Sequence, residues 1–188
     1  MKEAMGSGGA ECKWHMVIPI LIGLGANLPS PRHGLPVATL EAAVSALAGR
    51  GVQIIARSGW WESAPVPASD QPWYVNGVVE VGTNLGPENL LALLHGVEAE
   101  FGRVRTTPNA PRVLDLDLLA YGSLLRLGAD PPLLPHPRLA ERGFVLHPLA
   151  QIRPDWRHPA TGLTVAEMIA RLPAGQSIRL LPQSPASD

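Results

Sequence analysis

Val113-Leu114-Asp115-Leu116-Asp117-Leu118-Leu119-Ala120-Tyr121 is the stretch that decides the fold, because leucine and aspartate alternate through its centre. Successive side chains of a β-strand point to opposite faces, so the alternation predicts a half-buried strand whose leucines enter the core. Asp115 and Asp117 would then share the other face, with Cα atoms roughly 6.5–7 Å apart. Carboxylates at that separation can converge on two metal ions about 3.5–4 Å apart. Mg²⁺ is the natural choice, since it takes carboxylate oxygens together with water and substrate phosphates.

An aspartate pair on a strand is more often simply its solvated face, so the surrounding residues matter. The pair is flanked by five arginines, at Arg103, Arg105, Arg112, Arg138 and Arg142. His136 lies close by, between two prolines. Carboxylates that hold cations beside arginines that hold phosphates are the groups that phosphoryl transfer needs. The sequence therefore indicates a phosphoryl-transfer site, in which no residue stands out as a general base.

The rest of the chain predicts how this strand is placed. Apolar patterning and Pro/Gly punctuation indicate further strands at residues 17–24, 52–63 and 74–81, and helices at 37–47 and from about 84 to 101. The order β-α-β-β-α-β predicts an α+β, ferredoxin-like core, with an antiparallel sheet and helices on one face. Short helices near 145–150 and 164–171 predict a C-terminal helical extension. We expect a flexible leader or cloning remnant at 1–15, one domain at 16–181 and a disordered tail at 182–188.

Composition narrows the functional classes. The net charge of −1 argues against broad nucleic-acid binding, which depends on a surplus of Lys and Arg. The single cysteine, Cys12, excludes an intrachain disulfide and fits a reducing cytoplasm. The apolar run at 17–24 is too short to cross a bilayer. Gly23-Leu24-Gly25-Ala26-Asn27 follows a predicted strand, but it lacks the Gly-Lys-Ser/Thr ending of a P-loop. We expect a cytoplasmic monomer with no membrane or nucleic-acid partner.

Several ordered motifs together resemble one family. They are Gly23 to Leu28, Asp70-Gln71-Pro72 with Tyr74 and Asn76, Gly102 to Arg105, Pro111-Arg112 leading into Asp115 and Asp117, and Pro135-His136 leading to Arg142-Gly143-Phe144. In this order the chain resembles the 6-hydroxymethyl-7,8-dihydropterin pyrophosphokinases of folate biosynthesis, from about Ile20 to Pro154. The resemblance implies transfer of the diphosphate of ATP to the pterin hydroxymethyl group, with release of AMP.

The resemblance also implies a role for individual residues. Asp115 and Asp117 would hold two Mg²⁺ ions. ATP would be bound by Glu98, Arg103, Arg105, Arg112 and His136. The pterin would be bound by Tyr74, Asn76 and Phe144, and by the segment that contains Ser63, Ala64 and Val66. Arg142 would lie close to the hydroxymethyl group and join Arg103, Arg112, Asp115 and Asp117 in catalysis.

Two departures and two alternatives accompany this interpretation. The loop at 106–110 lacks the aromatic residue that the family often has, and residues 131–134 are apolar where some members contact the nucleotide. The adenine and ribose contacts are therefore not assigned. One alternative is a non-catalytic ferredoxin-like module that binds a regulatory small molecule, which would not turn over ATP. The other is an RNA-binding sheet, which would need exposed aromatics where the fourth strand carries aspartates.

Overall fold

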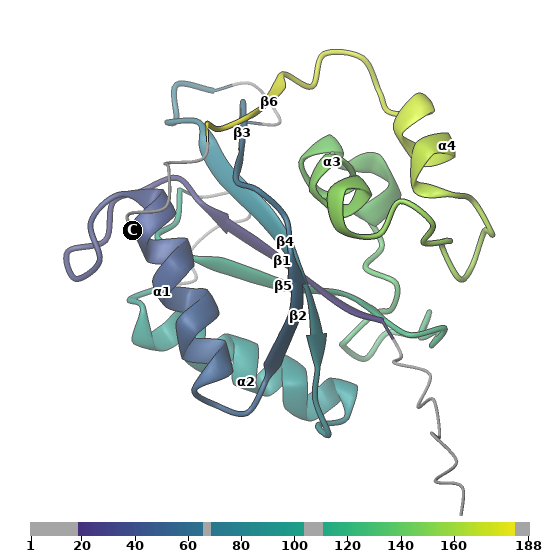
Figure 1. Ribbon diagram of the computed structural model, residues 1–188, viewed down its shortest axis with the longest axis horizontal. Coiled ribbons are helices and arrows are strands. Elements are labelled where there is room, and N and C mark those ends of the chain that lie inside the picture. Colours follow the sequence, from purple (N-terminus) through teal and green to yellow (C-terminus); the bar gives the residue numbers. More distant parts are fainter. Residues whose placement is uncertain (1–18, 66–68, 104–110, 183–188) are drawn as a thin grey trace, which may run out of the picture.

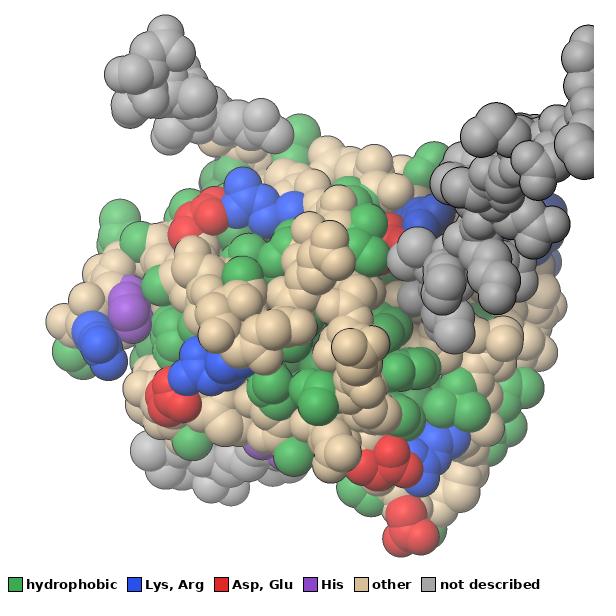
Figure 2. All heavy atoms as spheres, turned by 60° about the horizontal axis from the view of Figure 1, so that its bottom comes forward, with side chains coloured by type: hydrophobic (Ala, Val, Ile, Leu, Met, Phe, Trp, Pro, Cys, Tyr) green, Lys and Arg blue, Asp and Glu red, His purple; other side chains and the backbone are tan. Residues whose placement is uncertain are grey.

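The computed structural model of the protein describes residues 19–65, 69–103 and 111–182. The predicted leader at 1–15, the loop at 106–110 and all but the first residue of the predicted tail at 182–188 lie outside these ranges. No helix of the described residues is long and apolar enough to cross a membrane. On the face that Figure 2 shows, acidic and basic side chains are interspersed, in keeping with a net charge of −1.

An antiparallel sheet forms the middle layer of the fold (Figure 1). Its strands are β1 Ile20–Ala26, β2 Gln53–Arg57, β3 Trp61–Ser63, β4 Tyr74–Gly82, β5 Asp115–Tyr121 and β6 Ile178–Leu180. They run in the order β5-β1-β4-β3-β6, and β2 pairs with the other half of β4. The aspartate strand therefore lies at one edge, beside β1. The order of β5, β1, β4 and the β2/β3 segment confirms the predicted ferredoxin-like core.

Helices cover the two faces of the sheet (Figure 1). The helices α1 Pro36–Ala48 and α2 Pro87–Glu100 pack on the face that includes Ile22 and Leu116. Proline occupies the first turn of both, where its missing N–H costs no hydrogen bond. These two helices confirm the predicted helical face.

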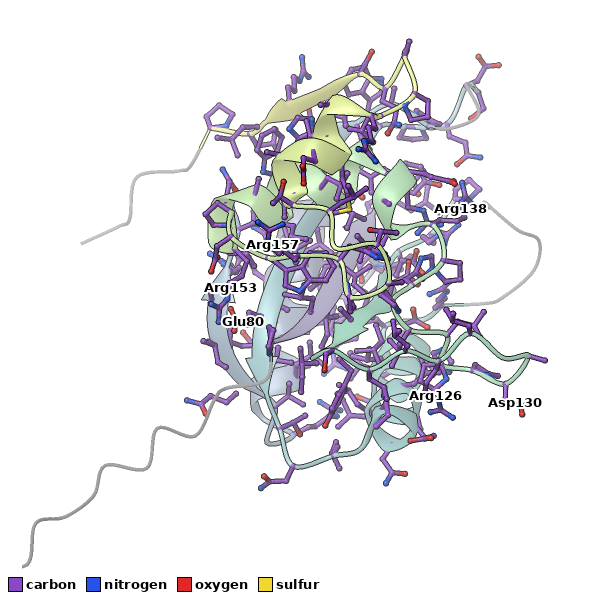
Figure 3. All side chains as sticks on the ribbon, turned by 90° about the vertical axis from the view of Figure 1, so that its right-hand side faces the viewer. Glu80, Arg126, Asp130, Arg138, Arg153 and Arg157 are labelled. Carbon is purple, nitrogen blue, oxygen red and sulfur yellow. The ribbon has the colours of Figure 1, made fainter. Side chains whose placement is uncertain are left out.

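The C-terminal helical extension covers the opposite face, which the sequence had left unassigned. It consists of a 3₁₀ turn at Leu139–Glu141, α3 Gly143–Ile152 and α4 Val165–Ala170. These helices bury Leu146 and Met168 against Leu21, Val78 and Leu119 of the sheet. At the far end of α3 the guanidinium of Arg153 donates to the buried carboxylate of Glu80 on β4, at 2.6 and 2.5 Å (Figure 3). The extension thus packs directly on the sheet.

The prediction of one continuous strand at 52–63 is wrong, because the chain leaves the sheet between β2 and β3. At the break, Ser58 makes a backbone hydrogen bond to Val78 O, and its hydroxyl accepts one from Val78 N, each 3.0 Å long. The indole of Trp60 lies over Gly77, where a Cβ atom would come within 2.6 Å of the ring. Ser58-Gly59 at the break is a dipeptide typical of turns, but the apolar pattern of residues 52–63 continues past it. The strand β6 was also missed.

The antiparallel pairing brings four chain segments to one end of the sheet. Ala26 at the end of β1 pairs with Val75, Gly25 pairs with Asp115, and Ser63 pairs with Tyr74. The last residues of β1 and β3 therefore lie beside the first residues of β4 and β5. The register of the strand pairing therefore places the side chains at this end of the sheet close to one another.

Candidate active site

Asp115 and Asp117 emerge on one face of β5, as the alternation predicts. Leu116 and Leu118 between and beyond them are buried in the core, at 2% and 4% exposure. The aspartate side chains retain 23% and 35% exposure, and both line a small hollow next to Gly23, Gly25 and Asn76. The residues of β1 paired with Asp117 and Asp115 are Gly23 and Gly25, which have no side chains to cover the carboxylates.

Three of the predicted arginines contact the aspartate pair. The guanidinium of Arg112 lies 2.8 Å from Oδ2 of Asp115, and that of Arg103 contacts Oδ1. Arg142 lies 3.2 Å from Oδ2 of Asp117. Cationic groups that can be offered to phosphates thus surround both carboxylates.

Glu98 is buried on α2, at 1% exposure, directly below this cluster. Its carboxylate accepts a hydrogen bond from the backbone N–H of Leu116, at 2.8 Å, and contacts the guanidinium of Arg103. Glu98 therefore joins α2 to β5 and orients Arg103. Its predicted contact with ATP stays a prediction.

The pKa values of the cluster reflect crowding and burial. Burial raises the pKa of Asp115 above its ordinary value, and the negative charge of Asp117 adds to this, while Arg112 and Arg103 oppose it. Burial likewise lowers the pKa of Arg142, although Asp117 acts in the opposite direction. Two crowded carboxylates that are partly out of water favour a bound cation.

His136 lies at the edge of the cluster rather than in the main cavity. Its backbone N–H donates to Leu119 O at 2.8 Å, and its Nδ1 accepts from the backbone N–H of Arg138 at 3.1 Å. Burial lowers its pKa. With Nδ1 used as an acceptor, the neutral ring carries its proton on Nε2, which makes Nε2–H a donor.

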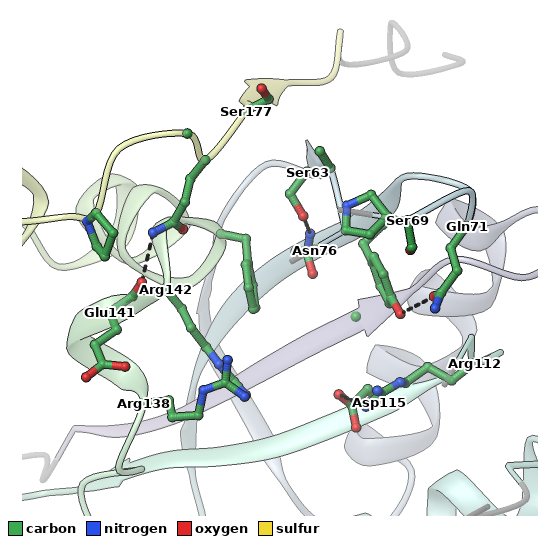
Figure 4. A pocket seen from close by; sticks show the side chains of 18 of the residues that line it. Ser63, Ser69, Gln71, Asn76, Arg112, Asp115, Arg138, Glu141, Arg142 and Ser177 are labelled. Carbon is green, nitrogen blue, oxygen red and sulfur yellow. Dashed lines mark hydrogen bonds and ion pairs between the residues drawn. The ribbon is translucent and has the colours of Figure 1, made fainter. Parts of the chain in front are cut away.

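A cavity of about 750 Å³ opens beside Asp115 (Figure 4). The predicted site residues that line it are Ser63, Ala64, Tyr74, Asn76, Arg112, Asp115, Arg142 and Phe144. Residues predicted separately for phosphate and for pterin thus border one space. Of the remaining predicted residues, Val66 and Arg105 lie outside the described ranges.

The cavity walls are tied together by hydrogen bonds (Figure 4). The amide of Asn76 donates to Ser63 Oγ at 2.9 Å, and the hydroxyl of Tyr74 donates to Gln71 Oε1 at 3.0 Å. The Arg142 guanidinium lies over the Phe144 ring, 5.5 Å from its centroid. Burial raises the pKa of Tyr74, so its hydroxyl is a neutral donor at pH 7. An aromatic face and an oriented amide are suitable partners for a flat, hydrogen-bonding ring.

The sequence interpretation assigned no individual binding role to several residues of this cavity. Gln71, Arg138 and Glu141 line it, and so do the five residues 173–177. Gln71 and Arg138 stand inside or beside the motifs that carried the resemblance, so a signal was present for them. Residues 173–177 lie beyond those motifs, and their spacing indicates no chemistry.

The described residues offer a metal ion two carboxylates, those of Asp115 and Asp117, and not a complete set of protein ligands. Among the described residues no group of three or more His, Cys, Asp or Glu side chains is placed to hold one. Mg²⁺ is commonly bound by one or two carboxylates, with substrate phosphates and water completing its shell. The donor set of Asp115 and Asp117 fits that mode.

Comparison with known proteins places the chain in a family. The family model described as 7,8-dihydro-6-hydroxymethylpterin-pyrophosphokinase matches residues 21–154. The chain is 40% identical to a Methylorubrum extorquens protein named 2-amino-4-hydroxy-6-hydroxymethyldihydropteridine pyrophosphokinase, over 82% of this chain and 94% of the relative. It is 39% identical to the protein of that name from Pseudomonas aeruginosa, over 84% and 94%.

Longer relatives contain the same domain as a part. The chain is 37% identical to the folic acid synthesis protein fol1 of Pneumocystis carinii, covering 81% of this chain and 20% of that protein. The crystal structure of wild-type HPPK-DHPS from Plasmodium falciparum matches with a TM-score of 0.63 and 13% identity, covering 81% of this chain and 44% of the other. The structural match supports the fold, and the sequence matches confirm the resemblance. The chain therefore belongs to the 7,8-dihydro-6-hydroxymethylpterin-pyrophosphokinase family.

Proposed function

We propose that the chain transfers the diphosphate of ATP to the hydroxymethyl group of 6-hydroxymethyl-7,8-dihydropterin and releases AMP, as a diphosphokinase of folate biosynthesis. The observation that carries the proposal is that one cavity is lined by both kinds of predicted residue. Asp115, Arg112 and Arg142 line it together with Asn76 and Phe144. Family membership agrees with it and does not favour the non-catalytic regulatory module.

In this proposal one end of the cavity handles ATP. Asp115 and Asp117 hold two Mg²⁺ ions, which when bound offset the negative charge of the phosphates. Further phosphate contacts come from Arg103, Arg105, Arg112 and His136. Glu98 lies beside Arg103 at the nucleotide end of the site. His136 donates through Nε2–H, since its Nδ1 already accepts from Arg138 N. Arginine suits phosphate oxygens because its planar fork donates two parallel hydrogen bonds.

The other end holds the pterin. Phe144 and Tyr74 supply aromatic surface, and the Asn76 amide meets the hydrogen-bonding edge of the ring. The segment with Ser63, Ala64 and Val66 borders the same edge. The Asn76 side chain is held by Ser63 Oγ at 2.9 Å, so it does not have to be ordered when the ring binds.

Binding in these two places sets up an in-line displacement. The pterin hydroxymethyl oxygen bonds to the β-phosphorus as its proton departs, and the β-phosphorus breaks its bond to the oxygen that bridges the α- and β-phosphates. AMP leaves with that oxygen. Arg142 contacts Asp117 and stacks on Phe144, so it stands where the two substrates would meet. Positioning and charge stabilisation are the chain's main contributions to rate.

Three broader expectations belong to the same proposal. Residues 16–181 form one domain, the chain acts as a monomer, and it works in the cytoplasm. The six-stranded sheet, which starts at Ile20 and ends at Leu180, supports the domain limits. The single cysteine supports a reducing compartment.

The test is turnover with ATP, Mg²⁺ and 6-hydroxymethyl-7,8-dihydropterin, with AMP resolved from ADP. AMP in equal amount to pterin diphosphate is the expected product pair. ADP would exclude diphosphate transfer, and binding without turnover would favour the regulatory module.

Asn76→Ala tests the pterin end. It should weaken pterin binding by about 1–3 kcal/mol, the cost of leaving buried polar groups without partners. Calorimetry with a non-hydrolysable ATP analogue, and then with pterin, measures the two affinities separately. Asn89→Ala, on the exposed side of α2, is the matched control. Equal losses for both ligands would assign Asn76 to the fold instead of the substrate.

A further inference from the structure

Residues 173–177, here called the wall segment, form one side of the main cavity. All five of them line it, together with Phe144, Arg142 and Ser63. The match to the family model ends at residue 154, so the wall segment lies outside the part of the chain that carries the family's motifs. Gly175 has φ = +89°, a conformation that glycine adopts without strain, and it turns the chain toward the cavity.

Gln176 connects the wall segment to the residues at the start of α3. Its side-chain oxygen accepts a hydrogen bond from Gly143 N at 2.8 Å, and its amide nitrogen donates to Glu141 O at 2.9 Å (Figure 4). Gly143 is the first residue of α3, where backbone N–H groups have no partner within the helix. The Gln176 amide therefore hydrogen-bonds to the residues immediately before and after Arg142. Phe144 is the next residue along the chain.

The approach of the wall segment to α3 is close. A Cβ atom on Gly143 would lie 2.4 Å from Ile178 Cδ1 and 3.1 Å from the Gln176 side-chain oxygen. A side chain at this position would therefore have to displace the Ile178 side chain of the C-terminal segment packed on it. The turn that carries Arg142 and Phe144 is pressed against that segment rather than free in solvent.

The wall segment is also joined to the opposite wall. Ala64 N donates to Ser177 O at 3.1 Å, and β6 pairs with β3 so that Ser63 lies opposite Ile178. Ser63 in turn holds the Asn76 amide. One short segment thus spans from the Asn76 wall to the Phe144 wall and sets the distance between them.

We propose that Gln176 is a positioning residue for the pterin ring, holding Arg142 and Phe144 at the separation from Asn76 that one flat heteroaromatic ring requires. The inference rests on the proposed function and extends it to a residue that contacts the substrate pocket from outside the family's motifs. It predicts a defect specific to the pterin, because the contacts of Arg103 and Arg112 with Asp115 do not involve the wall segment.

The experiment compares Gln176→Ala with Gln151→Ala. Gln151 is a matched control, since its side chain also joins two elements, accepting from Gly59 N at 3.0 Å and Trp61 Nε1 at 3.1 Å, and it does not line the cavity. Calorimetry measures the Kd of a non-hydrolysable ATP analogue with Mg²⁺, and then that of the pterin. Steady-state kinetics gives KM for each substrate, and thermal unfolding reports on stability.

Gln176→Ala should raise the Kd and KM for pterin by about tenfold, which corresponds to about 1.4 kcal/mol. Those for ATP should stay within about twofold, and Tm should match that of Gln151→Ala. Gln176→Glu keeps the acceptor for Gly143 N at a helix N-terminus but loses the donor to Glu141 O, so its pterin Kd should lie between those of wild type and Gln176→Ala.

Two results would overturn the inference. They are an unchanged pterin Kd in Gln176→Ala, and a parallel loss of both ligands together with a fall in Tm beyond that of Gln151→Ala. If wild-type chain bound no pterin, the proposed function itself would fall and take this inference with it.

Discussion

Asn27 and Arg112 hold each other through a reciprocal pair of hydrogen bonds. The side-chain oxygen of Asn27 accepts from Arg112 N at 2.8 Å, and Asn27 N donates to Arg112 O at 3.0 Å. The Asn27 amide also donates to Pro72 O at 3.2 Å. Asn27 is 2% exposed, and it joins the end of β1, the loop before β4 and the entry to β5. The place of Arg112 beside Asp115 thus depends on a buried amide from another strand.

Asn27→Ala should remove this junction. The free energy of unfolding should fall by about 1–3 kcal/mol, since the Arg112 N–H and Pro72 carbonyl lose a side-chain partner. Turnover should fall as well, because Arg112 is no longer held. Urea unfolding and steady-state kinetics measure the two effects, with the exposed Asn89→Ala as control. A stable variant with normal turnover would show that backbone bonds alone position Arg112.

Asp115→Asn should separate activity from stability. Turnover should drop by roughly two orders of magnitude or more, since the proposed mechanism assigns several kcal/mol of transition-state charge stabilisation to the metal that Asp115 would hold. Asp130→Asn, at the tip of an exposed loop, serves as control (Figure 3). An Asp115→Asn enzyme with wild-type turnover at saturating Mg²⁺ would contradict the metal role.

The same variant should be more stable than wild type without Mg²⁺. Burial, and then Asp117, raise the pKa of Asp115 above 3.8, so the folded chain holds this proton more tightly than the unfolded chain. The free energy of unfolding therefore decreases as pH rises from 3.8 through the raised pKa, and at neutral pH the ionised side chain is a cost. Urea unfolding in EDTA measures the difference. A less stable Asp115→Asn would mean that the arginine contacts outweigh burial.

Gly77 and Gly96 should respond oppositely to alanine. A Cβ on Gly77 would lie 2.6 Å from the Trp60 ring, whose Nε1 donates to Glu41 at 2.8 Å and resists a shift. Gly77→Ala should cost about 1–3 kcal/mol from overpacking. Gly96 is a helical residue with open space around it, so Gly96→Ala should stabilise by up to about 1 kcal/mol. Chemical denaturation compares the pair, and a neutral Gly77→Ala would show that Trp60 moves freely.

His158 should make the folded chain sensitive to mild acid. Its Nδ1 is the one buried side-chain polar atom without a hydrogen-bond partner in the described residues, and burial lowers its pKa below 6.5. The folded chain then binds fewer protons than the unfolded chain, so the free energy of unfolding falls as pH drops from 6.5 toward the lowered pKa.

His158→Gln removes this titration and should flatten the stability curve at pH values below 6.5. Urea unfolding across that range tests it, with His95→Gln on the exposed side of α2 as control. Identical slopes in wild type and His158→Gln would assign the acid sensitivity elsewhere.

Local patterning was enough to predict the ferredoxin-like core. The alternation around Asp115 and Asp117 predicted β5 and its two faces, since period-2 burial is a property of the strand itself. The break between β2 and β3 had only a weak local signal, Ser58-Gly59, and the packing of Trp60 on Gly77 that accompanies it involves another strand. β6 is three residues long and forms only by pairing with β3. Such an element has too little periodicity of its own to be recognised.

The same distinction between local sequence pattern and long-range packing applies to the residues of the site. Residues in short, ordered motifs, such as Arg112 and Asn76, were predicted, and the structure brings them to one cavity. Glu98 was predicted as a nucleotide contact, which stays a prediction, whereas its contacts with Arg103 and Leu116 N arise from the packing of α2 on β5. Gln176 was missed because its role arises from packing against Gly143, far away in sequence.

The late position of the wall segment in the chain has a consequence for protein synthesis. A chain is synthesised from the N-terminus onward, whereas a domain generally folds as a unit. The residues that contact the aspartate pair, of which Arg142 is the last, leave the ribosome before residues 173–177, which follow every other part of the cavity lining. A nascent chain that already contains every arginine and aspartate of the cluster therefore still lacks one side of the cavity. On the proposed function, a chain cut short before Gln176 would keep the residues assigned to ATP and lose one wall of the pterin pocket.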